Sequence, residues 1–225
     1  MSYTIESIAE CIGARRVGEC EATIDWLLTD SRSLSFPEET LFFALTTKRN
    51  SGARYIPDLY DRGVRNFVVT EEDFEKFKNG ELGKLSTLNF LIVANPLKAL
   101  QKLAEIHREE FKIPIIGITG SNGKTIVKEW LHQLLSPDRR IVRSPRSYNS
   151  QIGVPLSVWQ LNEEAELGIF EAGISEMGEM NALKRMIKPT IGILTNIGGA
   201  HQENFFSLQE KCMEKLTLFK DCDVV

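Results

Sequence analysis

A glycine-rich loop between a short apolar run and a helical segment is the feature that most constrains this chain. The letters GITGSNGKT occupy residues 117–125, directly after a predicted strand at 115–119 and directly before a predicted helix at about 123–135. Its three glycines let the backbone curl so that successive N–H groups face an anion, and the helix adds its positive N-terminus. This order of strand, glycine loop and helix predicts a phosphate-binding loop in an α/β domain.

Within this loop, Lys124 would reach the β- and γ-phosphates of a nucleotide, and the hydroxyl of Thr125 would bind Mg²⁺. The standard motif GxxxxGK, followed by Ser or Thr, would require a glycine at residue 118. This chain has Ile118 there, and the nearest glycine is Gly117, so the spacing departs from the motif. A glycine-rich tight turn without a ligand is therefore the alternative interpretation. The other phosphate contacts are expected from the loop residues Gly120, Ser121, Asn122 and Gly123.

Strands and helices alternate from this loop to the end of the chain, which predicts a mostly parallel sheet covered by helices on both faces. The expected strands cover 115–119, 140–143, 167–171, 190–195 and 222–225, and the expected helices cover about 123–135, 153–161, 179–187 and 207–219. A smaller α/β domain is expected to precede this sheet. Its expected parts are a helix at 3–12, a helical stretch at 56–62, a surface excursion at 71–86 and a strand at 89–93. The predicted domains are residues 1–95 and 96–225, connected by a helix at 97–111.

Charge and hydropathy exclude several classes of protein. The net charge of −4 argues against a protein that holds nucleic acid on a basic face. The apolar runs are far shorter than the roughly 20 residues that span a bilayer. The N-terminus has no apolar signal core, so we expect no membrane insertion and a cytoplasmic location. The last predicted strand stops within an apolar run, so we expect the native protein to continue beyond it.

Two further motifs end predicted strands, FEAG at 170–173 and TNIGGAH at 195–201. Because the carboxyl ends of parallel strands share one edge of the sheet with the loop, Glu171 and His201 are expected beside the bound phosphates. A carboxylate and an imidazole there would form a divalent-metal site. The alternatives are a solvated strand end for Glu171 and a capping or surface role for His201. A GTPase switch is disfavoured, because neither DxxG nor NKxD occurs.

In this order and spacing, GITGSNGKT, YNSQIGVP (148–155), FEAG and TNIGGAH resemble the ATP-dependent Mur ligases of peptidoglycan synthesis. TDSR (29–32) and LFFAL (41–45) resemble the uridine-nucleotide-binding domain of the same enzymes. The resemblance covers nearly the whole chain. Within the family, the stretch from Thr195 to Ser207 is similar to the MurF-type subgroup, which joins D-Ala-D-Ala to UDP-MurNAc-tripeptide.

The resemblance implies ATP as a substrate, Mg²⁺ as a cofactor and an acyl phosphate as the activated form of the tripeptide. It implies that Thr125 and Glu171 hold a first Mg²⁺ and that His201 holds a second. It also identifies Lys215 as a carbamylated lysine, a modification that turns a cation into an oxygen ligand. From the residues alone, Lys215 is an exposed helix lysine. The implied catalytic set is Lys124, Glu171, His201 and Lys215.

Further contacts follow from the same resemblance. Asn149 and Asn196 match asparagines near the phosphates. Asp30, Ser31 and Arg32 match a substrate-binding segment, and an Asx-type turn that closes a strand is the alternative for them.

The resemblance also implies a C-terminal domain that these residues do not contain, so the chain alone is expected to bind ligands weakly and not to turn over. The opening segment resembles versions fused to an alanine racemase, and pyridoxal phosphate would belong only to that missing domain. The rival hypotheses are another Mur-type ligase that adds the third peptide residue, a nucleotide-dependent binding module, and a catalytically inactive interaction domain.

Overall fold

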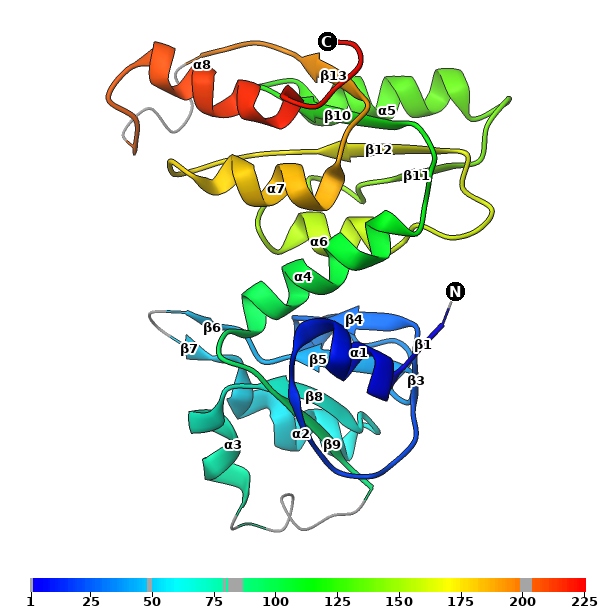
Figure 1. Cartoon of the computed structure of the whole chain (residues 1–225), viewed down its shortest axis with the longest axis vertical. Coiled ribbons are helices and arrows are strands. Elements are labelled where there is room, and N and C mark those ends of the chain that lie inside the picture. Colours follow the sequence, from blue (N-terminus) through cyan, green and yellow to red (C-terminus); the bar gives the residue numbers. More distant parts are fainter. Residues whose placement is uncertain (1, 48–49, 79, 81–86, 199–203) are drawn as a thin grey trace. The chain divides into compact units, whose positions relative to one another are not determined.

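The computed structural model describes residues 2–47, 50–78, 80, 87–198 and 204–225 (Figure 1). The chain divides into two compact units, Met1–Leu103 and Ala104–Val225. The division falls inside helix α4 (Pro96–Glu109), the helix expected to connect two domains. In the part of the chain that the structure describes, no helix has both the length and the apolar character needed to cross a membrane.

The first unit is built on a five-stranded sheet with the order β2-β9-β8-β5-β4. Its first pair, β2 and β9, is antiparallel, and the other neighbours are parallel. The strands are β2 (Arg15–Val17), β4 (Trp26–Leu28), β5 (Thr40–Phe43), β8 (Asn66–Val69) and β9 (Asn89–Ile92). The last three of these are buried along their whole length, as parallel strands covered on both faces are.

Smaller elements complete the first unit. Helix α1 begins after Thr4, whose hydroxyl accepts a hydrogen bond from the Ser7 N–H, and ends at Gly13 with a φ of 65°. The helices between residues 5 and 61 are α1 (Ile5–Ile12), α2 (Ile56–Asp61) and the 3₁₀ helices η1 (Ser31–Ser33) and η2 (Gly52–Tyr55). Two small antiparallel pairs are β1 (Tyr3–Thr4) with β3 (Thr23–Ile24), and β6 (Thr46–Thr47) with β7 (Asn50–Ser51).

A helix, α3 (Glu71–Lys78), lies where the sequence predicted only a surface excursion. Its first turn carries acidic residues and its last turn carries lysines, which complements the helix dipole. The ring of Phe74 is buried and lies 5.3 Å from the ring of Phe90 in an edge-on arrangement. The prediction was incomplete because the same charges that indicate a loop also suit the two ends of a helix.

The second unit contains a four-stranded parallel sheet with the order β11-β12-β10-β13. The strands are β10 (Ile115–Thr119), β11 (Ile141–Arg143), β12 (Leu167–Glu171) and β13 (Ile191–Leu194). Because β10 pairs with both β12 and β13, the segments that follow these strands meet at one edge of the sheet. The expected α/β fold with a parallel sheet is confirmed for this unit.

The predicted strand at 222–225 is wrong. In the described part of the chain, this segment joins the sheet only through an isolated bridge between Ile191 and Val224. Cys222 packs against the larger core, but Val224 and Val225 stay mostly exposed, so the end of the segment gains little apolar burial from pairing with β13.

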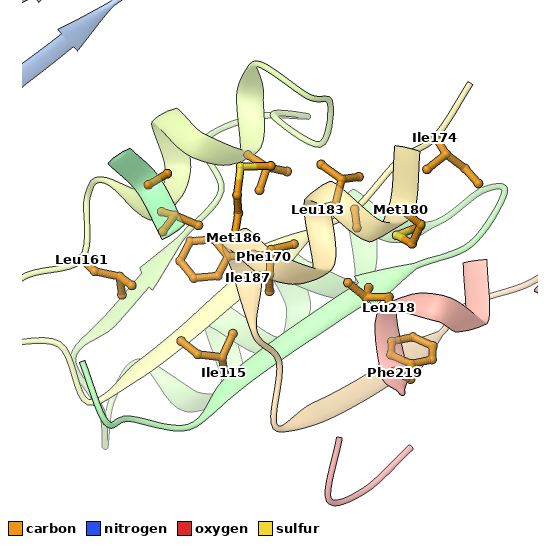
Figure 2. Close-up of a cluster of buried hydrophobic side chains, with 14 of the residues drawn as sticks. Ile115, Leu161, Phe170, Ile174, Met180, Leu183, Met186, Ile187, Leu218 and Phe219 are labelled. Carbon is orange, nitrogen blue, oxygen red and sulfur yellow. The ribbon is translucent and has the colours of Figure 1, made fainter. Parts of the chain in front are cut away.

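Helices cover both faces of the second sheet (Figure 1). On one face, Ile116 and Ile118 pack with the apolar side of α5. On the other face, Ile115 and Phe170 belong to a larger core with side chains of α6, α7 and η5, as Figure 2 shows for the α7 and η5 residues. The helices are α5 (Lys124–Leu135), α6 (Gly153–Val158), α7 (Glu179–Ile187), α8 (Leu208–Leu216) and the 3₁₀ helix η5 (Thr217–Phe219).

Two glycines let the helical layer approach this second face closely. Gly117 of β10 and Gly192 of β13 lie opposite each other in the register of the sheet. A methyl group on Gly117 would come within 2.8 Å of the Pro189 side chain, and one on Gly192 within 2.5 Å of the Phe219 ring. The backbone of the sheet is therefore in direct contact with the layer that covers it.

Phe170→Ala is expected to lower the free energy of unfolding by about 3–5 kcal/mol, because it removes a fully buried ring from the larger core. Phe206→Ala is the matched control, because that ring is 99% exposed and its loss should change stability little. Urea unfolding of both variants measures the difference, and equal stabilities would contradict this assignment of the core.

Candidate functional site

The loop between β10 and α5 has a backbone that requires glycine at two positions. Gly120 has a φ of 145° and Gly123 a φ of 81°. A methyl group on Gly120 would lie 1.9 Å from the hydroxyl oxygen of Thr195. Gly123 is the N-cap of α5, so the first N–H groups of that helix, which have no partner inside the helix, lie at the end of the loop. This is the arrangement that binds anions at a helix N-terminus.

The segment that follows β13 fastens one side of the loop. The N–H of Ser121 donates to the carbonyl oxygen of Asn196 at 2.9 Å, and the N–H of Asn122 donates to Asn196 Oδ1 at 3.0 Å. The Thr195 hydroxyl donates to the Asn122 carbonyl at 2.6 Å. These two N–H groups, expected to contact phosphates, are engaged by Asn196 in the structure. The N-terminal turn of α5, which includes Lys124 and Thr125, is left as the source of donors for an anion.

The end of β12 lies on the other side of the loop. The Thr125 hydroxyl donates to Glu171 Oε2 at 3.0 Å and lies 3.4 Å from the Ser147 hydroxyl. Glu171 has no exposed surface. Its other oxygen, Oε1, lies 3.0 Å from the ammonium group of Lys128, a residue that the sequence analysis did not single out. The alternative of a solvated strand end for Glu171 is wrong, because the neighbouring strands and α5 enclose it.

Thr125 and Glu171 fit a divalent cation that prefers oxygen. A hydroxyl and a carboxylate oxygen, 3.0 Å apart, are hard donors suited to Mg²⁺. Among the described residues, no three His, Cys, Asp or Glu side chains gather as a metal site. A Mg²⁺ held here would therefore take further oxygens from phosphate or water, as nucleotide-bound Mg²⁺ does. His201, expected to hold a second ion, lies outside the described residues.

A pocket of about 150 Å³ opens beside the loop. The Lys124 ammonium donates to the Gly120 carbonyl at 2.9 Å, and the Lys215 ammonium donates to the same carbonyl at 3.2 Å. Two cations on one wall favour an anionic ligand. The lining residues are Gly120, Ser121, Lys124, Asn149, Ser150, Gly173, Ile174, Ser175 and Lys215. The pocket therefore brings Lys124, Lys215 and Asn149 together, as the expected site requires.

Lys215 is buried, with only 3% of its surface exposed, so the expectation of an exposed helix lysine is wrong. Burial, together with the positive charges of Lys124 and Lys211, lowers its pKa to about 8. Burial also lowers the pKa of Lys124. Lys211, whose ammonium donates to the Gly198 carbonyl at 2.6 Å, was missed by the sequence analysis. The available signal was its spacing, because residues four apart on α8 share one face.

In the first unit, Asp30, Ser31 and Arg32 follow β4 and form a turn. Asp30 Oδ1 accepts a hydrogen bond from the Arg32 N–H at 3.0 Å, and the carboxylate also pairs with the Arg32 guanidinium at 2.6 Å. This pairing lowers the pKa of Asp30 to about 2. The Asx-type turn is therefore present. The Arg32 side chain is 88% exposed, and its contact with a substrate stays a prediction.

Comparison with known proteins gives this geometry its context. Residues 118–224 match the model of the Mur ligase middle domain. The UDP-N-acetylmuramoyl-tripeptide–D-alanyl-D-alanine ligase of Borreliella burgdorferi is 36% identical over 200 residues, a match that covers 87% of this chain and 42% of that protein. The chain belongs to the Mur ligase family.

Solved structures of Mur ligases agree with this assignment. MurF from Acinetobacter baumannii superposes on 99% of this chain and 47% of its own with a TM-score of 0.83 at 23% identity, which shows a shared fold. The MurF ligase of Thermotoga maritima, solved in complex with ADP, is 25% identical with a TM-score of 0.72 and covers 88% of this chain and 43% of its own. The chain thus spans about half the length of the Mur ligases it matches.

Lys124→Met is expected to raise the pKa of Lys215 above its value of about 8, because removing a neighbouring positive charge favours the charged form of Lys215. Lys220→Met is the control, because Lys220 is exposed and is not among the charges that shift Lys215. NMR titration of ¹³C-labelled lysine side chains measures the pKa. An unchanged value in Lys124→Met would show that the two ammonium groups do not interact.

Proposed function

We propose that this chain is the nucleotide- and UDP-sugar-peptide-binding part of a MurF-type ligase, which joins D-Ala-D-Ala to UDP-MurNAc-tripeptide with ATP. The observation that carries the proposal is the Thr125–Glu171 pair at the glycine loop beside a pocket walled by Lys124 and Lys215. Relatives with this printed name match most of the chain and support the choice within the family. A cytoplasmic location, where ATP and UDP-linked precursors occur, belongs to the same proposal.

In this proposal, the phosphates of ATP lie against the loop and the first turn of α5. The ammonium of Lys124, which donates to Gly120 at 2.9 Å, turns toward the β- and γ-phosphates. Thr125 and Glu171 hold Mg²⁺, which supplies charge neutralisation and polarisation of the phosphoryl oxygens. Asn149 and Asn196 keep the neighbouring loops in place around the phosphates.

The reaction requires two anions to meet. An oxygen of the tripeptide carboxylate attacks the γ-phosphorus, the bond to the ADP oxygen breaks, and an acyl phosphate forms. The amine of D-Ala-D-Ala then attacks the acyl carbon, loses a proton, and phosphate leaves as the amide forms. The concentrated positive charge of Lys124 and its neighbours stabilises both steps electrostatically. Such stabilisation is stronger in a site that is shielded from water, and Lys124 is half-buried there.

Lys215 is proposed to act as a carbamate. Its lowered pKa of about 8 raises the fraction of neutral amine near neutral pH, and the neutral amine is the form that adds to CO₂ and releases a proton. The product is an anionic oxygen ligand beside Lys124 and Lys211, and would exchange repulsion between cations for attraction. With His201, it is proposed to hold a second Mg²⁺.

The first unit is proposed to bind the uridine nucleotide. Asp30, Ser31 and Arg32 follow β4, and the exposed guanidinium of Arg32 is a suitable donor for a phosphate or uracil oxygen. The direct test is calorimetric binding of UDP-MurNAc-tripeptide to the chain, with UDP-MurNAc-dipeptide and UDP-N-acetylglucosamine as controls. Preference for the tripeptide supports the proposal. Absence of binding by all three would contradict the role given to the first unit.

Lys124→Ala is expected to weaken ATP binding in Mg²⁺ by at least about tenfold, because it removes a charge-assisted contact with phosphate. Thr125→Val is expected to abolish the gain in affinity that Mg²⁺ brings, while affinity without the metal stays the same. Ile126→Ala is the control, because this neighbouring side chain is mostly exposed. Calorimetric titrations with and without Mg²⁺ measure all three, and wild-type binding by Lys124→Ala would contradict the proposed phosphate site.

A further inference from the structure

We propose that Lys128 is a positioning residue that orients the Glu171 carboxylate toward the metal and fixes the loop after β11. This inference rests on the proposed function, because it assigns to Glu171 the role of a Mg²⁺ ligand. It adds a residue to which neither the glycine-loop motif nor the family resemblance assigned a role.

The contacts of Lys128 are unusual for a lysine on a helix. It lies one turn after Thr125 on the same side of α5 and has no exposed surface. Its ammonium lies 3.0 Å from Glu171 Oε1 and donates to the Ser144 carbonyl at 2.7 Å. It also donates to the Arg146 carbonyl. The ammonium group is thus directed inward, toward β12 and the loop after β11.

The two oxygens of Glu171 are divided between the two α5 residues. Lys128 is paired with Oε1, and the Thr125 hydroxyl donates to Oε2. This division fixes the rotation of the carboxylate so that Oε2 faces the hydroxyl expected to share the metal. Without Lys128, the buried carboxylate would lose the cation that lies against its Oε1 and keep only the longer-range attraction of Lys124, which would favour rotation of the carboxylate away from its present orientation.

The same ammonium group also holds the loop that follows β11. Arg146 has a φ of 48°, the left-handed conformation that is uncommon for a residue with a side chain, and its carbonyl accepts from Lys128. The loop then brings Ser147 to 3.4 Å from the Thr125 hydroxyl and Asn149 to the wall of the pocket. Lys128 therefore links the carboxylate and the pocket wall to one helix.

The contacts of the Lys128–Glu171 pair differ from those expected of an ion pair that serves only stability. Buried ion pairs are often replaced by apolar residues without loss of stability, so burial alone does not explain the pair. Here one oxygen of the carboxylate stays directed at a hydroxyl, and the cation also accounts for two carbonyls of a strained loop. The orientation of the carboxylate and the hold on the loop both act on the site. The apolar core on this face of the sheet involves the other side of α5 and does not include Lys128.

The test compares Lys128→Met with the wild-type chain, using Mn²⁺ as the probe together with the ATP analogue AMP-PNP. Electron paramagnetic resonance measures bound Mn²⁺, and calorimetry measures affinity for AMP-PNP without metal. We expect the half-saturating Mn²⁺ concentration to rise about 10–100-fold, as when a residue that orients a metal ligand is lost. Affinity for metal-free AMP-PNP should stay the same. Wild-type Mn²⁺ saturation in a folded Lys128→Met chain would overturn the proposal.

Two further variants keep the test decisive. Glu129→Gln is the matched control. Glu129 Oε1 also lies 3.2 Å from the Lys128 ammonium group, but this side chain is 35% exposed, and its change should leave Mn²⁺ saturation unchanged. If Lys128→Met folds poorly, Lys128→Arg replaces it in the test, because arginine keeps the positive charge beside Glu171. The planar guanidinium of arginine cannot reproduce the contacts of the ammonium group. A weaker Mn²⁺ saturation in Lys128→Arg supports the proposal, and wild-type saturation overturns it.

The outcomes separate this inference from the proposed function. A wild-type chain that binds AMP-PNP but gains no affinity from Mn²⁺ would contradict the metal role of Thr125 and Glu171, and with it both proposals. A wild-type chain that binds Mn²⁺ normally, with unaffected Lys128 variants, would contradict the positioning role alone.

Discussion

The hydrogen bonds of β10 to two parallel neighbours determine the geometry of the second unit. They align the carboxyl end of β12 on one side of the glycine loop and the end of β13 on the other. Asn196 then holds the loop through its carbonyl and its amide oxygen, while Glu171 lies beneath the first turn of α5. A glycine loop at an edge strand would lack one of these walls. The anion site is therefore a property of strand order as much as of the loop itself.

Charge is distributed unequally around this loop. On the β12 side, the carboxylate of Glu171 is balanced by the ammonium of Lys128, and both are fully buried. On the α8 side, burial and the positive charge of Lys211 lower the pKa values of Lys124 and Lys215. The balanced side offers oxygen ligands to a cation, and the positive side offers attraction to anions. A metal nucleotide, which carries both kinds of charge, suits this asymmetry.

The sequence predicted the parts of the site that depend on strand order. Glu171 could be placed beside the loop because FEAG ends a strand and parallel strands end at one edge. The burial of Lys128 and Lys215 could not be predicted, because a lysine on a helix is exposed unless tertiary partners enclose it. The two errors in secondary structure, at α3 and at 222–225, have the same cause. Local composition does not show whether Phe74 is buried or whether Val224 remains exposed.

Because of the glycines of β10 and β13, the residues on the two faces of the second sheet are not equally free to change during evolution. On the α5 face, branched apolar side chains fill the space, so exchanges among Ile, Val and Leu can be absorbed by repacking. On the other face, Pro189 and Phe219 meet bare backbone at Gly117 and Gly192, and no smaller residue exists to compensate for a bulkier neighbour. Homologous sequences should therefore drift on the first face and retain glycine on the second.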